Sequence, residues 1–202
     1  MYNTFLSFKK GAAQTYFATL LSLQILFENR KKGDKGNDCL LSVDGADVRI
    51  AMSYCKEFHS HNFKKSALRY EVRLNIKTGD ICWVNGGYAP GIWNDDMIFK
   101  DAIVDELEEG ERVETDMGYK ASAPKYVKCP GTIWSDKEKM KMQTRVCARQ
   151  ETVNKRMKNW NILKAPYRHD IVDHQIVFVA IAVLTQLSFE NGEPLFEVEY
   201  ND

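Results

Sequence analysis

The chain has 202 residues, of which 44% are hydrophobic and 28% are charged, and its formal net charge at pH 7 is zero. This length and apolar content are sufficient for one globular domain with its own core. The longest uninterrupted apolar run has nine residues, from Ile176 to Leu184, whereas a membrane span needs roughly 20. We therefore expect a soluble protein without a membrane partner.

The neutral total hides an uneven distribution of charge. Residues 118–169 contain 13 lysines and arginines against three acidic residues, whereas residues 94–116 contain ten acidic residues and two basic ones. A concentrated basic segment is typical of a surface that binds phosphates. The basic segment thus favours a nucleic-acid partner, although the total charge on its own does not.

The five cysteines are odd in number, and no two of them form a Cys-x-x-Cys pair. The residues after Met1 show no signal-peptide pattern. These features favour a reducing compartment and free thiols.

The first half of the chain predicts a helix followed by strands. Residues 13–29 have apolar side chains at helical spacing, and the polar loop 31–37 ends this helix. A strand is expected at 39–44, ending in Asp44. Apolar and polar residues alternate from Leu68 to Ile76, and the turn at 78–80 joins this strand to another at 81–84, so we expect a hairpin.

An acidic helix and a short strand come next. Asn94 is the expected N-cap, and Gly110 the expected stop signal. The predicted apolar face of this helix consists of Met97, Ile98, Ala102, Ile103 and Leu107. A strand at 111–115 then leads to Asp116.

The last third of the chain is expected to be mainly helical. Residues 120–135 predict a loop with a short strand at 126–129, and residues 136–163 predict one long helix. The helix at 175–187 is apolar on every face, so we expect it to be buried, with a final short strand at 195–198.

This order of elements predicts an α/β protein with a ribonuclease-H-like fold, in which helices flank a mixed five-stranded sheet. In that architecture the first and fourth strands lie side by side, which would bring Asp44 and Asp116 together. Glu151, on the long helix, is the expected third carboxylate. Three converging carboxylates need a compensating cation, and oxygen ligands suit Mg²⁺ or Mn²⁺.

Three segments of the sequence also match a known family. Val43-Asp44-Gly45, Thr115-Asp116-Met117-Gly118-Tyr119 and the segment 149–160 together resemble the signature blocks of Harbinger-type (PIF-like) transposases, which are DDE superfamily endonucleases. The family pattern is Asp-Gly, Asp-x-Gly-Tyr, and a helical Glu with Lys seven residues later and an aromatic residue shortly after. The 34 residues between Asp116 and Glu151 are also typical of the wider class. Two departures are Ala46, where a polar residue is usual, and the slightly early Trp160.

The resemblance implies a DNA endonuclease and transposase that hydrolyses phosphodiesters and transfers strands. Two metal ions, Mg²⁺ or Mn²⁺, would be held by Asp44, Asp116 and Glu151, with Asp44 bridging them. Arg149, Lys155 and Lys158 are the expected DNA-binding cations. Such proteins act in the nucleus, and we expect DNA as the partner, with a Myb-like accessory protein and a homodimer as further candidates.

The resemblance divides the chain into two regions. Residues 38–202 correspond to the DDE catalytic domain, and residues 1–37 are expected to be the remnant of a longer N-terminal region. Because no recognition helix is evident before Asp44, specific recognition of DNA is expected from a missing N-terminal segment or from a partner.

Other interpretations remain open. A domesticated or decayed transposase-derived protein would bind DNA or a partner without cutting, and another ribonuclease-H-like nuclease is a third candidate. Glu151 alone could be a surface residue paired with Lys155 four positions later, and both Asp-Gly segments are common turn chemistry. The occurrence of all three blocks in order favours catalysis.

Overall fold

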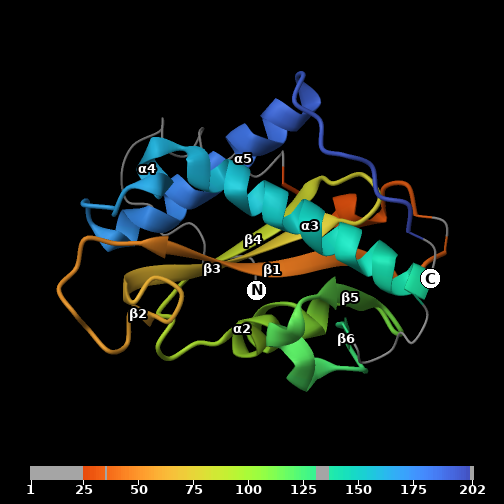
Figure 1. The fold of residues 1–202 in the computed structure, drawn as a ribbon, viewed down its shortest axis with the longest axis horizontal. Coiled ribbons are helices and arrows are strands. Elements are labelled where there is room, and N and C mark those ends of the chain that lie inside the picture. The colour runs from red at the N-terminus through yellow and green to blue at the C-terminus, as the bar shows by residue number, and fades with distance from the viewer. Residues whose placement is uncertain (1–24, 35, 131–136, 201–202) are drawn as a thin grey trace.

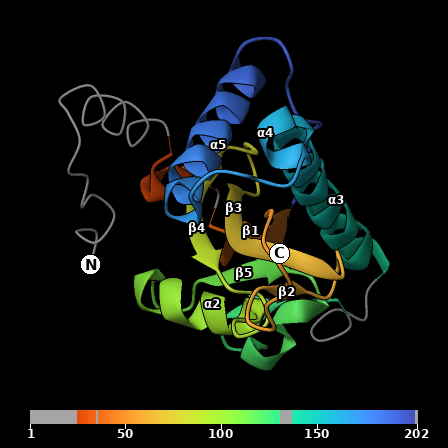
Figure 2. The ribbon, with the colours of Figure 1, turned by 90° about the vertical axis from the view of Figure 1, so that its left-hand side faces the viewer.

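The computed structural model describes residues 25–34, 36–130 and 137–200. Helices lie on both faces of a mixed sheet (Figures 1 and 2). The predicted α/β class is thus confirmed. The sheet has six strands instead of five, because the two-residue strand β2 (His59–Ser60) joins it. Most of the predicted helix at 13–29 lies outside the described residues, and its end forms a 3-10 helix, Phe27–Lys31.

The central strand of the sheet is β1. It pairs antiparallel with β3 on one side and parallel with β5 on the other. β4 extends the sheet beyond β3, and β6 extends it beyond β5. These strands are β1 (Cys39–Arg49), β3 (Lys65–Asn75), β4 (Ile81–Tyr88), β5 (Arg112–Thr115) and β6 (Val127–Lys128).

The hairpin predicted from residue alternation is present as β3 and β4, with Gly79 in the turn at a φ of 80°. β4 is longer than the predicted strand at 81–84, because it continues through Gly86. A Cβ at Gly86 would lie 2.6 Å from the Cα of Tyr70, so glycine allows the two backbones to approach.

The prediction that the first strand ends at Asp44 is wrong. β1 continues to Arg49, which places Asp44 near the middle of the strand. Beyond Gly45, the buried residues Ala46 and Val48 continue the alternation and pair with Tyr70 and Leu68 of β3. An Asp-Gly pair alone does not end a strand whose next residues still have a core to pack against.

The helices form two layers. α3 (Lys137–Asn159), α4 (Asn161–Lys164) and α5 (His174–Glu190) cover one face of the sheet, and α2 (Asp95–Ala102) lies on the other (Figure 2). The predicted single helix at 136–163 is divided at Trp160, whose backbone is extended. No strand forms at 195–198.

The predicted N-cap of the acidic helix is confirmed, since the Asn94 side chain accepts a hydrogen bond of 2.8 Å from the Met97 N–H. α2 ends earlier than predicted, at Ala102, and a 3-10 helix follows at Val104–Glu106. Its buried face includes Ile98 and Phe99, whereas Met97 is 42% exposed. The short helix is thus positioned by a narrower apolar face than predicted.

Each face of the sheet has its own core. On the α3 side, Val72 of β3 belongs to a cluster with Val153 and Phe178. On the α2 side, Val43 of β1 belongs to a cluster with Phe99 and Tyr119. Alternate residues of β1 therefore serve opposite cores, and Asp44 faces the α3 layer, as does its cross-strand partner Val72.

α5 is less buried than predicted. Phe178 stacks on Tyr70 with ring centroids 3.8 Å apart, yet Leu184 is 43% exposed. The helix forms an outer layer, so only one side packs on the sheet and α3. By length and composition alone, the segment Ile171–Glu190 is the one helix among the described residues that could cross a membrane.

Candidate active site

Two neighbouring strands bring Asp44 and Asp116 together. β1 and β5 run parallel, with Val43 opposite Thr115, so the two aspartates occupy the next position on adjacent strands. Asp116 leaves the ladder there, and its Oδ1 accepts a hydrogen bond of 2.8 Å from the Gly118 N–H. Although Asp44 does not end its strand, the strand pairing still places it beside Asp116.

α3 crosses these strands with a polar stripe. Cys147, Glu151, Asn154 and Lys158 follow one another at spacings of three or four residues, which places them on one side of a helix. Gln150 fixes the helix on the sheet. Its Oε1 accepts from the Ser42 hydroxyl at 2.7 Å, and its Nε2 donates to the Val72 carbonyl at 3.0 Å.

Asp44, Asp116 and Glu151 line one pocket of about 310 Å³ between β1, β5 and α3. We refer to it as the carboxylate pocket. Its other lining residues are Ser42, Val43, Glu114, Thr115, Cys147 and Gln150. As the side chains are placed, the described residues contain no group of three or more His, Cys, Asp or Glu that could hold a metal ion.

Burial and repulsion dominate the electrostatics of the pocket. Burial, followed by the charge of Asp116, raises the pKa of Asp44 to about 7. A hydrogen bond from Gly45 and the charge of Lys158 act in the opposite direction, and Asp95 adds to the rise. The ionised form of Asp44 is therefore destabilised at neutral pH, and a cation in the pocket would stabilise it.

The pKa of the Cys147 thiol is raised by burial and by the same negative charges. Burial raises the pKa of its thiol to about 12, and four nearby carboxylates add to the rise. These carboxylates are Glu114, Asp116, Asp44 and Glu151. The pocket is thus a region of concentrated negative charge.

Two of the acidic residues near the pocket were missed by the sequence analysis. Glu114 is fully buried and lines the pocket, where it accepts hydrogen bonds from Tyr200 at 2.5 Å and from Gln143 at 2.6 Å. The signal was present, because Glu114 precedes Asp116 by two residues and so lies on the same face of the strand.

Asp95, at the start of α2, is the second missed residue. A Cβ at Gly45 would lie 2.4 Å from Asp95 Oδ1, and a Cβ at Gly118 would lie 3.4 Å from Asp95 Oδ2. The glycines that follow Asp44 and Asp116 thus leave room for this carboxylate, which also pairs with Arg69 at 3.5 Å. At a helix N-terminus an aspartate is ordinarily explained by the helix dipole, so no pattern in the sequence distinguished Asp95.

The three predicted DNA-binding cations occupy different environments. Lys155 is exposed, and Lys158 is half-buried near Asp44 and Asp47, with its pKa lowered by burial. Arg149 is 2% exposed, and its guanidinium donates to the backbone carbonyls of Asn75 and Ile76 in the β3–β4 turn. Arg149 thus lies inside the fold, and the function proposed below does not use it.

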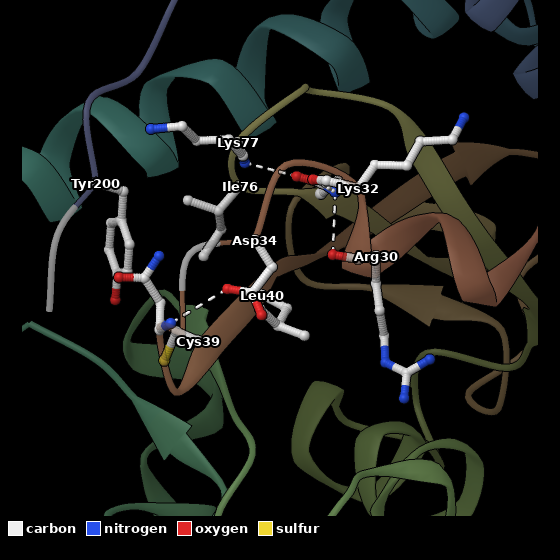
Figure 3. A pocket seen from close by; sticks show the side chains of 10 residues that line it. Arg30, Lys32, Asp34, Cys39, Leu40, Ile76, Lys77 and Tyr200 are labelled. Carbon is white, nitrogen blue, oxygen red and sulfur yellow. Dashed lines mark hydrogen bonds between the residues drawn. The ribbon is translucent and has the colours of Figure 1, made fainter.

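A second pocket, of about 240 Å³, lies between the loop after residue 30 and the β3–β4 turn (Figure 3). One of its lining residues is Asn75, which is 1% exposed and donates to the carbonyls of Asn29, Arg30 and Lys32. The Asn75 Oδ1 accepts from the Lys77 and Thr78 N–H groups. These bonds fasten two loops together, so we assign this pocket a structural role.

Comparisons of the chain with protein-family models, with curated protein sequences and with solved structures return no match. What the carboxylate pocket can do therefore depends on its own residues. It combines buried and exposed carboxylates, and the charge of Lys158, at one end of the α3 stripe, acts on Asp44. This donor set fits a hard divalent cation with oxygen ligands.

Proposed function

We propose that this chain is a metal-dependent DNA endonuclease and transposase of the Asp-Asp-Glu class. The observation that carries the proposal is that Asp44, Asp116 and Glu151, which are far apart in sequence, line one pocket. The raised pKa of Asp44 supports it, because a carboxylate destabilised by burial and by a neighbouring charge is typical of a functional site.

The sheet topology also supports the proposal. Apart from the two-residue β2, β1 and β5 are the first and fourth strands, and they lie side by side in a mixed sheet. This is the neighbour relation expected for a ribonuclease-H-like fold, which we propose for the chain. The resemblance to Harbinger-type transposases implies the same fold, a location in the nucleus and DNA as the substrate.

In this proposal Asp44, Asp116 and Glu151 hold two Mg²⁺ or Mn²⁺ ions. The bound ions would supply an activated water or 3′-hydroxyl and stabilise the leaving oxygen. The protein contributes the positions of its carboxylates, with Asp44 fixed on the central strand and Glu151 on the exposed side of α3. Lys155 and Lys158 would contact backbone phosphates without reading the sequence.

The proposal can be tested by nicking of supercoiled plasmid DNA in Mg²⁺ or Mn²⁺. We expect Asp44→Asn, Asp116→Asn and Glu151→Gln each to lower the nicking rate at least about 100-fold, because each removes a cation ligand. Glu109→Gln is the matched control, since Glu109 is exposed and lies outside the pocket. Nicking at the wild-type rate by any of the three variants would overturn the assignment.

The same assay separates cutting from binding alone. A wild-type chain that binds DNA but does not nick it in either metal would exclude the nuclease and favour the transposase-derived binding protein. Nicking that survives removal of divalent ions by a chelator would contradict the metal-dependent mechanism.

A further inference from the structure

Asn154 contacts Asp44, which lines the carboxylate pocket, but does not belong to the predicted triad. It lies three residues after Glu151 on the polar stripe of α3. Its Nδ2 donates a hydrogen bond of 2.7 Å to Asp44 Oδ2, and the residue is 6% exposed. Among the hydrogen bonds between side chains in the described residues, this one joins α3 directly to the central carboxylate.

The other end of the same amide has no partner. The amide nitrogen faces Asp44 as the donor, so the amide oxygen points elsewhere. Asn154 Oδ1 is buried and has no hydrogen-bond partner in the described part of the chain. Leaving a buried acceptor unpaired costs roughly 1–3 kcal/mol.

Packing alone does not explain an asparagine at this position. The neighbouring Val153 and Met157 on α3 are buried and belong to the apolar core. A leucine would fill a similar volume without an unpaired oxygen, but it would leave Asp44 Oδ2 without its donor. Unsatisfied polar groups that persist in native structures typically mark a bound water, an ion or a catalytic role.

We infer that Asn154 is the positioning residue of Asp44. Its N–H holds one carboxylate oxygen, so that the other would be free to bind a cation in the pocket. The inference rests on the proposed function and extends it from the three ligands to the residue that orients the central one. Such outer partners typically change metal affinity or activity by 10–100-fold.

Mn²⁺ binding, without DNA, tests this role through the signal of free Mn²⁺ in electron paramagnetic resonance. We expect Asn154→Leu to weaken Mn²⁺ binding about 10–100-fold, because it keeps the side-chain volume and removes the donor. Asn154→Gln retains the amide and should recover part of the affinity. Asn159→Leu is the matched control, since it makes the same change at an exposed position of the same helix.

Melting temperatures without metal establish that the variants are folded. If Asn154→Leu does not fold, Asn154→Val replaces it, with the same expected loss of affinity, because valine also lacks a donor. A folded Asn154→Leu or Asn154→Val protein that binds Mn²⁺ within twofold of wild type would overturn the inference.

The outcomes distinguish this inference from the proposed function. If wild type binds Mn²⁺ and Asp44→Asn does not, the metal site stands, and an unchanged affinity in Asn154→Leu rejects only the role of Asn154. If wild type and Asp44→Asn bind Mn²⁺ equally, the pocket is not the metal site and both proposals fail. In a nicking assay, a positioning role predicts a lower kcat with little change in the KM for DNA.

Discussion

Asp44 is a carboxylate that the fold holds in a largely buried position beside other acidic residues. It lies on the central strand, faces the helical layer, and is surrounded by Asp116 and the further carboxylates of the pocket. Its own partners are the Asn154 amide and the Gly45 N–H. These contacts offset only part of the cost of holding a carboxylate there, which is why its pKa lies near 7.

The raised pKa of Asp44 predicts a pH-dependent gain in stability for Asp44→Asn. The pKa of Asp44 is about 7 in the folded state and about 3.9 in the unfolded chain. Asp44 therefore contributes its full share of stability below about pH 4, and this share is lost as pH rises through 7. The variant removes that loss. Without metal we expect its melting temperature to exceed that of wild type by about 4–8 °C at pH 8, which corresponds to about 2 kcal/mol.

At pH 3 the two proteins should melt within about 1 °C of each other, because Asp44 is then largely protonated in both states. Adding Mg²⁺ at pH 8 should stabilise wild type more than the variant. Glu109→Gln serves as the control and should show no pH-dependent difference. Equal melting temperatures of wild type and Asp44→Asn at pH 8 without metal would contradict the raised pKa of Asp44.

At the scale of elements, sequence patterns predicted the features that depend on neighbouring residues in the chain. The alternation of residues gave the β3–β4 hairpin, and the Asn94 cap gave the start of α2. The end of β1 was missed because it depends on β3, which lies next to it only in the folded chain. The exposure of α5 likewise depends on which elements pack against it, and the composition of the helix does not predict those contacts.

The site shows the same division. The order of elements and the three sequence blocks together were sufficient to predict that Asp44, Asp116 and Glu151 lie near one another, and these residues line one pocket. Asn154 could not be found this way, because an asparagine on a helix has no distinctive pattern. Arg149 could have been assigned correctly, as it lies three residues after Val146 and four before Val153, on the buried side of α3.

The buried position of Arg149 leads to a prediction about α3. Arg149→Met should lower the melting temperature by about 4–8 °C, because the carbonyls of Asn75 and Ile76 lose their donor. Affinity for DNA, measured by fluorescence anisotropy below the melting temperature, should stay within twofold of wild type.

Lys155→Met is the matched control on the same helix. Lys155 is exposed, so this variant should melt within about 2 °C of wild type and bind DNA more weakly. If Arg149→Met weakened DNA binding as much as Lys155→Met without a change in melting, Arg149 would be a DNA contact and not a structural residue.

At the scale of the whole molecule, the zero net charge conceals an uneven distribution of charge between the helices on the two faces of the sheet. The acidic segment 94–116 includes α2, on one face of the sheet, and the basic segment 118–169 includes α3 and α4, on the other (Figure 2). The carboxylate pocket lies against α3. In the proposed function, cations on the α3 side would attract DNA toward carboxylates that would otherwise repel its phosphates.

This arrangement predicts DNA binding that depends on salt and not on sequence. Contacts to phosphate release counterions, and the logarithm of the affinity for duplex DNA falls with the logarithm of salt concentration by about 0.9 for each phosphate contact. Anisotropy measurements on two duplexes of unrelated sequence should give the same slope. Lys155→Met and Lys158→Met should each weaken binding to both duplexes and reduce the slope by about one.

Lys100→Met provides the control from the opposite side of the molecule. Lys100 is on α2, within the acidic segment, and pairs with Asp96 at 2.6 Å, so its loss should leave both affinity and slope unchanged. If Lys100→Met altered binding as much as Lys155→Met, DNA would not approach the α3 side, and the pocket would not face the substrate. A strong preference for one duplex at physiological salt would show that the described residues include base contacts, because phosphate contacts carry no sequence information.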